Sequence, residues 1–257
     1  MVEDNSKRTE SLAGADGPVE PRRGEPRIGR RDSEPHSEEV SYLYDVLRTN
    51  YPGSRATWDL HHHFKVDGEE IDIQLDVSFF HGWRGPNKLS SYNASEHGGR
   101  VPDVAINILS KGTWKDDIGE NVDVCRMAKI PVYVVFAPFH VASKTYKPPF
   151  LRVYRMGPGG RYSFEEKRGV AMKHGSDAID WHETVDCGEH VPFRFGLMEL
   201  AETHDKGWPL YRLVLLDAEK KAVLLSSLEQ EKQRAEQEKQ RADRLQAELN
   251  RLRKPVE

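Results

Sequence analysis

The sequence predicts a mixed α/β domain, a twisted sheet with helices on its flanks, followed by a long C-terminal helix. Three observations lead to this fold class. Residues 101–136 read as a strand, a helix and a second strand, which is a βαβ unit. Residues 71–80 alternate apolar and polar side chains, as a half-buried strand does. Residues 229–235 and 236–242 have identical sequences, and this seven-residue period is typical of a helix with a repeating face.

Composition excludes several classes of protein. A net charge of −4 with 31% charged residues gives no electrostatic case for tight, non-specific nucleic-acid binding. The two cysteines, Cys125 and Cys187, lie far apart and lack the spacing of a zinc site, which favours a reducing compartment. No apolar run approaches the roughly 20 residues of a membrane span, and none near residue 1 resembles an export signal. We therefore expect a cytoplasmic protein with no membrane partner.

We divide the chain into three parts. Residues 1–37 are rich in Glu, Arg, Gly, Pro and Ser and hold almost no large apolar side chain, so we expect a disordered tail. The folded domain is expected over residues 38–217, with Ser37 as the N-cap of its first helix. Residues 218–257 are expected to form a helical, coiled-coil tail.

Strands are expected on both sides of the βαβ unit. Residues 57–66 and 71–80 precede it, and two hairpins follow, formed by 151–156 with 161–164 and by 193–197 with 211–216. Alternation over 71–80 predicts one apolar face, made of Ile71, Ile73, Leu75, Val77 and Phe79. The helix of the βαβ unit is expected over residues 113–128, with Thr113 and Asp116 as a short-side-chain capping box.

The tail carries a heptad seam with a weak centre. One seam position is occupied by Leu228, Ala235, Ala242 and Leu249, and the other by Leu224, Glu231, Glu238, Leu245 and Leu252. The two glutamates interrupt the apolar stripe, so a coiled coil should be weak or short in the middle. Glu-to-Lys or Glu-to-Arg pairs three residues apart support the helix even alone. A homodimer through the domain or this tail and a solitary solvated helix are both open, and we expect the homodimer.

Acidic side chains gather on the predicted strands and helix in a pattern that suits metal-dependent nucleases. Such enzymes hold Mg²⁺ with carboxylates on adjacent strands and use a lysine near the phosphate. Asp72 and Asp76 share the polar face of one strand, and Asp103 shares a face with Asn107 on another. From the helix, Asp117, Glu120 and Asn121 could reach the same region.

Two other groups of residues have weaker interpretations. In the run His61-His62-His63, neighbours on a strand point to opposite faces, so at most His61 and His63 could chelate a metal together. A polar strand face is the alternative. Around the loop at 82–100, Trp83, Arg84, Lys88 and Arg100 could contact a nucleic-acid backbone, or simply form a solvated loop.

Residues 102–136 resemble the bacterial family named "putative restriction endonuclease" in the PD-(D/E)xK nuclease superfamily. The resemblance is carried by Pro102, Asp103, Ile108-Leu109-Ser110, Thr113, Asp117, Gly119, Glu120 and the strand Ile130-Pro131-Val132-Tyr133. Upstream, Leu75-Asp76-Val77-Ser78-Phe79 is similar to the family's Pro-Asp-Leu-Ala-Val strand. The resemblance implies a restriction-endonuclease-like fold and Mg²⁺-assisted hydrolysis of DNA phosphodiester bonds. It also implies metal ligation at Asp76, Asp103 and Asn107, with Glu120 and Asn121 as further catalytic candidates.

Two departures from the family's pattern bear on activity. The family's central catalytic Glu falls on Asn107, and the Lys after its Gly-Glu pair falls on Asn121. An Asn brings no negative charge to a hard cation, and loss of the lysine removes a cation from the transition state. An impaired nuclease is therefore expected, unless Lys111 or Lys115 substitutes. The competing class is a non-catalytic binding or scaffold protein that uses the nuclease fold as a platform and its tail for dimerisation.

Overall fold

The computed structural model describes residues 33–141 and 144–252. Residues 1–32, most of the expected disordered tail, lie outside the described residues. The helices are α1 (Glu34–Asn50), α2 (Trp114–Asp117), α3 (Glu120–Met127) and α4 (Ser227–Leu252). The strands are β1 (Arg55–Val66), β2 (Glu69–Phe80), β3 (Tyr92–Asn93), β4 (Val104–Ile108), β5 (Val132–Phe136), β6 (Leu151–Met156), β7 (Tyr162–Lys167), β8 (Met172–Lys173), β9 (Thr184–Asp186), β10 (Arg194–Thr203), β11 (Pro209–Asp217) and β12 (Ala222–Val223). Short 3-10 turns cover Ala94–His97, Lys144–Tyr146 and Trp181–Glu183.

Most of the strands form a seven-stranded mixed sheet in the order β3-β1-β2-β4-β5-β6-β7. Strands β4 and β5 are parallel, with α2 and α3 in the connection between them, so the predicted βαβ unit is confirmed. The first predicted hairpin is the antiparallel pair β6-β7. The second is β10-β11, which forms the centre of a smaller sheet with β8, β9 and β12. The predicted class, a mixed sheet flanked by helices with a long C-terminal helix, is confirmed.

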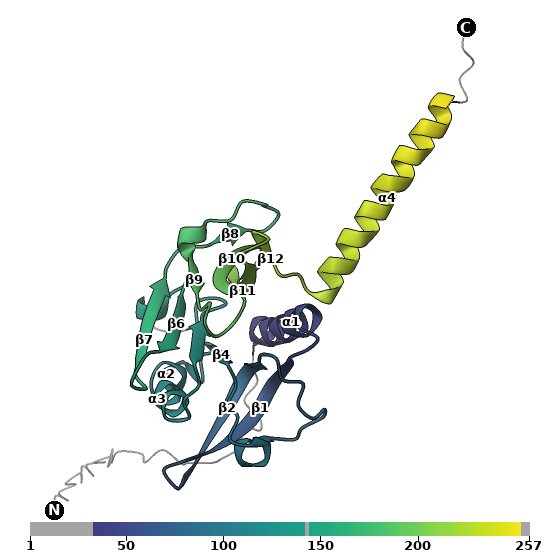
Figure 1. Ribbon diagram of the computed structural model, residues 1–257. Helices are drawn as coiled ribbons and strands as arrows, with labels where there is room; N and C mark the ends of the chain where they lie inside the picture. Colours follow the sequence, from purple (N-terminus) through teal and green to yellow (C-terminus); the bar gives the residue numbers. More distant parts are fainter. Residues whose placement is uncertain (1–32, 142–143, 253–257) are drawn as a thin grey trace, which may run out of the picture. The chain divides into compact units, whose positions relative to one another are not determined.

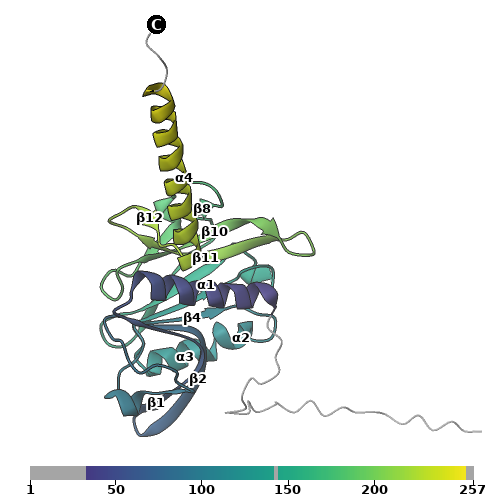
Figure 2. The same ribbon diagram turned by 90° about the vertical axis from the view of Figure 1, so that its right-hand side faces the viewer.

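The large sheet separates two apolar cores. Helix α1 and the smaller sheet cover one face, and α2 and α3 lie on the other (Figures 1 and 2). We call the first the α1-side core; it includes Leu43, Val77, Ile106, Val134 and Leu213. The second, the α3-side core, includes Leu75, Ala105, Val124 and Tyr133. Because both faces of β4 and β5 are covered, all ten residues of these strands are buried, as in the central strands of α/β proteins.

The predicted single apolar face of residues 71–80 is wrong, because the alternation changes face at Asp76. Ile73 and Leu75 pack into the α3-side core, whereas Val77 and Phe79 pack into the α1-side core. The paired strand, β1, changes face at Asp59, which stands opposite Asp76. The backbone of Asp59 is left-handed, with a φ of 46°. A residue with left-handed backbone rotates the strand that follows it, as in a β-bulge.

Helix boundaries differ from those expected at both ends of the domain. Helix α1 starts at Glu34 with Ser33 as N-cap, because Pro35 in its first turn has the backbone angle that a helix start requires. Helix α4 starts at Ser227, nine residues after Ala218. The preceding segment belongs to the domain instead: β12 pairs with β11, and Leu224 is buried.

The expected helix over residues 113–128 is broken at Gly119 into α2 and α3. A Cβ at Gly119 would lie 2.9 Å from the carbonyl oxygen of Lys115, so the tight turn favours glycine. The predicted capping box is wrong: the Thr113 hydroxyl donates to Asp117 Oδ2 at 2.8 Å rather than capping the helix. Asp117 of α2 and Asn121 of α3 nevertheless lie at the same end of β4, because Asp117 Oδ1 accepts from both Asn107 and Asn121.

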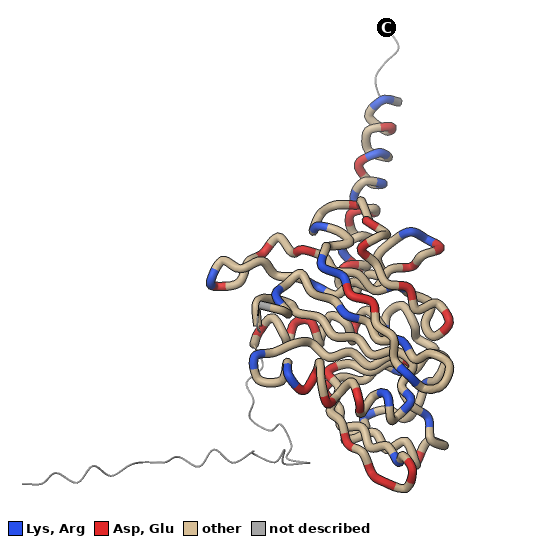
Figure 3. The backbone as a smooth tube through the Cα atoms, turned by 90° about the vertical axis from the view of Figure 1, so that its left-hand side faces the viewer, with Lys and Arg blue, Asp and Glu red and all other residues tan. Residues whose placement is uncertain are grey.

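None of the described helices combines the length and the apolar character needed to cross a membrane. Helix α4 is long but mostly polar and exposed, with basic and acidic residues interspersed along it (Figure 3). Its first turn is anchored to α1, because the Ser227 amide and hydroxyl both donate to Asp45 Oδ2, at 2.6 and 2.8 Å. A capping box starts it: Glu229 Oε2 accepts from Ser226 N at 2.7 Å.

A buried ion pair joins α1 to the smaller sheet. Arg212 Nε donates to Glu39 Oε1 at 2.8 Å, the Leu213 amide donates to Glu39 Oε2, and the guanidinium lies 4.1 Å from the centre of the Tyr42 ring. The Glu39 side chain is 3% exposed. Burial raises the pKa of Glu39 from 4.5 to about 7, although Arg212 opposes the shift.

We predict that Arg212→Met lowers the free energy of unfolding by about 3 kcal/mol at pH 8, because it leaves a buried carboxylate without its cation. The loss should shrink as the pH falls toward 4.5, because protonation removes the charge of the buried Glu39 carboxyl, whose pKa is raised in the folded state. Urea unfolding at pH 8 and pH 5 measures both values. The double variant Arg212→Met with Glu39→Gln is the control and should recover stability at pH 8. Equal losses at the two pH values would contradict the prediction.

Candidate functional site

The candidate site lies where β2 and β4 diverge. The last paired residues are Val77 and Ile106, so Asp76 and Asn107 stand opposite each other one position further on. The Asp76 amide donates to Asn107 Oδ1 at 3.2 Å, and the Ile108 amide donates to Asp76 Oδ2 at 2.7 Å. Side chains thus replace the backbone ladder at this point, and they close the gap between the two strands.

A buried carboxylate, Asp117, is the centre of the site. Its Oδ1 accepts hydrogen bonds from the amide groups of Asn107 and Asn121, each at 2.9 Å. Its Oδ2 accepts from Thr113 at 2.8 Å, and its backbone carbonyl accepts from the Tyr133 hydroxyl at 2.8 Å. Asp117 is 1% exposed and Asn107 is fully buried. We call Asn107, Thr113, Asp117 and Asn121 the amide–carboxylate network.

The network affects its buried neighbours electrostatically. Burial raises the pKa of the Tyr133 phenol well above its usual range, and the negative charge of Asp117 adds to this effect. Burial also raises the pKa of the Cys125 thiol, again with a contribution from Asp117. Both groups therefore stay neutral at physiological pH, and the described structure holds no activated thiol at this site.

Helix α1 reaches the site from the other side. His36 Nε2 lies 3.2 Å from Asp76 Oδ2, and the His36 residue is 5% exposed. Sequence reasoning missed His36, because the helix was expected to start four residues later, with Ser37 instead of Ser33 as its N-cap. From the sequence, Asp117 was only one of three helix residues expected to reach the region of Asp76 and Asn107. A signal for Asp117 existed: it stands four residues after Thr113 and four before Asn121, on one helical face.

The structure does not bring Asp103 and Glu120 into this cluster. Asp103 lies at the opposite end of β4, where its Oδ2 accepts from the His81 amide at 2.7 Å and lies 3.6 Å from Arg100. Asn107 follows Asp103 by four positions, which is about 13 Å at the usual rise per residue of a strand. Glu120 is exposed at the start of α3. Period-2 spacing placed Asp103 and Asn107 on one face but did not place them at one site.

The side chains present do not fit the Mg²⁺ site that the resemblance implies. Within residues 33–141 and 144–252, no three His, Cys, Asp or Glu side chains converge as a metal site requires. Mg²⁺ needs an octahedron of oxygen ligands. Here Asn107 turns its NH₂ group toward Asp117 and its oxygen toward the Asp76 amide. The histidine run does not supply a site either: His63 Nδ1 lies against Asp72 Oδ1, and among the described residues no group of three ligands forms around His61 and His63. His62 is buried between the Leu60 carbonyl and Ser78, and burial lowers its pKa to about 4.

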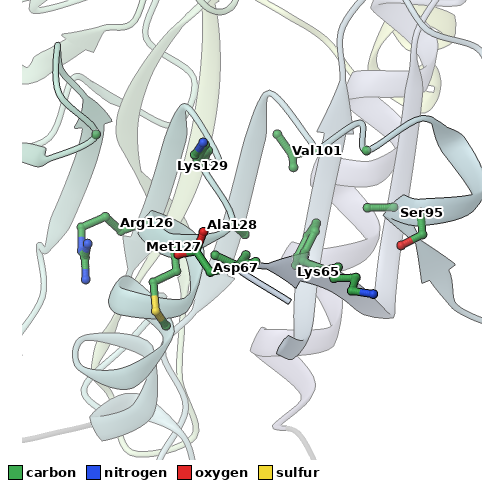
Figure 4. Close-up of a pocket in the computed structure, with 13 residues that line it drawn as sticks. Lys65, Asp67, Ser95, Val101, Arg126, Met127, Ala128 and Lys129 are labelled. Carbon is green, nitrogen blue, oxygen red and sulfur yellow. The ribbon is translucent and has the colours of Figure 1, made fainter. Parts of the chain in front are cut away.

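A separate cavity of about 480 Å³ lies near the β1–β2 turn and the end of α3. Lys65, Arg126 and Lys129 are among its lining residues. In Figure 4, the side chains of Lys65 and Arg126 lie on opposite sides and point away from each other. Charges that diverge in this way do not form an anion site.

No family model matches this chain, and no curated protein matches it. Among solved structures, it is similar to a protein from Anabaena variabilis described as a putative nuclease belonging to DUF820. The two share 18% sequence identity with a TM-score of 0.41, over 55% of this chain and 70% of that chain. Neither a family nor an activity follows for this chain from these comparisons.

We predict that Asn107→Asp destabilises the fold by about 2–4 kcal/mol at pH 8, because it replaces a donor to Asp117 with a second buried carboxylate. The effect should become smaller at pH 5, where one proton shared by the two carboxylates restores a hydrogen bond. Urea unfolding at the two pH values measures it. Asn250→Asp adds the same charge at an exposed position of α4 and should cost less than 0.5 kcal/mol. A similar small loss for both variants would show that the network does not constrain the core.

Proposed function

We propose that this protein is a nuclease-like module that has lost metal-dependent DNA cleavage and acts as a non-catalytic binding or scaffold protein. The observation that carries the proposal is the amide–carboxylate network. Its two amides stand at the positions where the resemblance expects the catalytic Glu and Lys. Both amides donate to Asp117.

The chemistry of these substitutions supports loss of catalysis. A glutamate at residue 107 would bring negative charge for Mg²⁺, and a lysine at residue 121 would bring positive charge for a phosphate. With asparagine at both positions, the amides instead satisfy the buried carboxylate of Asp117. The polar groups therefore stabilise the packing of α2 and α3 on β4, which is a structural role.

Asp76 is the candidate ligand that remains, and it favours the alternative of a weakly active nuclease. Its side chain is 13% exposed, so an ion could approach it. However, its Oδ2 already accepts from the Ile108 amide and faces His36. A single carboxylate in these contacts is a poor ligand set for a cation that prefers several oxygen ligands.

We predict that the purified protein shows no saturable Mg²⁺ or Mn²⁺ binding up to millimolar metal in calorimetry, and no cleavage of plasmid DNA. The variants Asp76→Ala and Asp72→Ala form a matched pair, since both residues are on β2 and only Asp76 contacts β4. Metal binding and cleavage that Asp76→Ala abolishes and Asp72→Ala retains would overturn the proposal in favour of an active nuclease.

The history of the site can be tested by the double reversion Asn107→Glu with Asn121→Lys. We expect Mn²⁺-dependent DNA cleavage at least tenfold above the parent, because the reversion restores the charges that such chemistry uses. Adding Asp76→Ala should remove the gained activity. A soluble, folded reversion that is as inert as its parent would contradict the assignment of these two positions.

The scaffold part of the proposal assigns self-association to α4. Leu228, Leu245 and Leu249 are 58%, 53% and 49% exposed on this helix, at seam positions of the heptad. Apolar side chains repeated on one helical face are buried when two such helices pair. The pairing would be strongest near the C-terminal end, where leucine replaces glutamate in the seam.

We predict that the protein is a dimer in sedimentation velocity and that Leu245→Glu with Leu249→Glu converts it to a monomer. Ala247→Glu, at a position on the opposite helical face, is the control and should leave the dimer intact. A wild-type monomer at 100 µM would rule out assembly through α4, although it would leave the loss of catalysis untouched.

A further inference from the structure

A groove of about 1140 Å³ lies on the edge of the large sheet, outside the candidate site. Its floor is the first half of β1, and its walls are the C-terminal half of α1 and the loop after β2, which curves beside β1 in Figure 1. The loop is fixed in shape: the Gly82 amide donates to Ser54 Oγ at 3.0 Å, and Arg55 donates to Asn87 at 3.2 Å. The groove is therefore a formed feature of the surface.

The groove concentrates positive charge on a chain whose net charge is negative. Arg48, Arg55, Arg84 and Lys88 line it, against one carboxylate, Asp59. Gln74 donates a hydrogen bond to Asp59 Oδ1, so part of this carboxylate's acceptor capacity is already used. Clustered cations along a groove attract the backbone of a polyanion.

Aromatic rings accompany these cations. Trp58 is 54% exposed although it lies on an ordered strand, and its ring centre is 6.2 Å from that of Tyr44. The guanidinium of Arg48 lies 5.2 Å from the centre of the Tyr44 ring. An exposed tryptophan beside cations offers a face on which a nucleobase can stack.

From these three observations we infer that the groove binds single-stranded nucleic acid, with bases stacked on Trp58 and phosphates held by the four cations. Single strands suit the site because their bases are free to stack, whereas the bases of a duplex are already paired. An acidic peptide could pair with the four cations, but it has no nucleobases to stack on Trp58. The inference holds whether or not the candidate site cleaves DNA.

The test is fluorescence anisotropy of the full-length protein with labelled 20-nucleotide single-stranded DNA, single-stranded RNA, duplex DNA of the same sequence, and a poly-glutamate peptide. We expect both single strands to bind, and at least tenfold more tightly than the duplex or the peptide. Trp58→Ala should weaken single-strand binding about 5- to 100-fold, the range for loss of one stacked base. Arg84→Gln should weaken single-strand binding and reduce the magnitude of the slope of log K against log salt by about 1, the effect of losing one phosphate contact.

Matched controls exist elsewhere on the surface. Phe164 is an aromatic residue of β7 that is 57% exposed, and Lys129 is an exposed cation of the other cavity. Phe164→Ala and Lys129→Gln should leave binding unchanged. Trp58 and Arg84 are both exposed, and thermal unfolding followed by circular dichroism checks that their variants fold. The proposal is overturned if single strands fail to bind at 100 µM protein, if Trp58→Ala and Arg84→Gln bind like the parent, or if the duplex or the peptide binds best.

Discussion

Accommodating the buried carboxylate of Asp117 is the constraint around which the centre of this domain is arranged. A carboxylate at 1% exposure is tolerated only if hydrogen bonds replace its hydration. The donors come from three different elements: Asn107 from β4, Thr113 from the turn before α2, and Asn121 from α3. One polar contact set therefore fixes how the helices pack on the sheet.

Local sequence signals predicted the longer strands and helices but not all of their boundaries, and they missed the short strands β3, β8, β9 and β12. The strands β2, β4 and β5 were recognisable because alternation and apolar runs are properties of neighbouring residues. The start of α1 is marked locally by Ser33 and Pro35, which the choice of Ser37 as N-cap overlooked, whereas the position of β12 depended on pairing with β11. The face change at Asp76 was invisible because it involves the partner strand, where Asp59 takes a left-handed conformation.

The candidate site shows the same division between local and long-range information. Asp76, Asn107 and Asn121 were identified from the sequence, and they lie together or share a partner in the structure. Asp103 shares a strand face with Asn107, but a shared face can extend over the whole strand and does not define a site. His36 contacts Asp76 across 40 residues of chain, and no periodicity within α1 points to that contact.

The irregularity at Asp59 and Asp76 connects the network to the groove. Before it, Ala56 packs into the α1-side core and Trp58 contacts Tyr44 of α1; after it, Leu60 packs into the α3-side core. If the alternation of β1 continued unchanged, Trp58 and Leu60 would share a face. Either Trp58 would then lose its contact with Tyr44, or Leu60 would leave the α3-side core. The same change of face lets Asp76 turn to the end of β4, where it accepts from the Ile108 amide. The exposure of Trp58 and the closure of the β2–β4 gap therefore have a common structural cause.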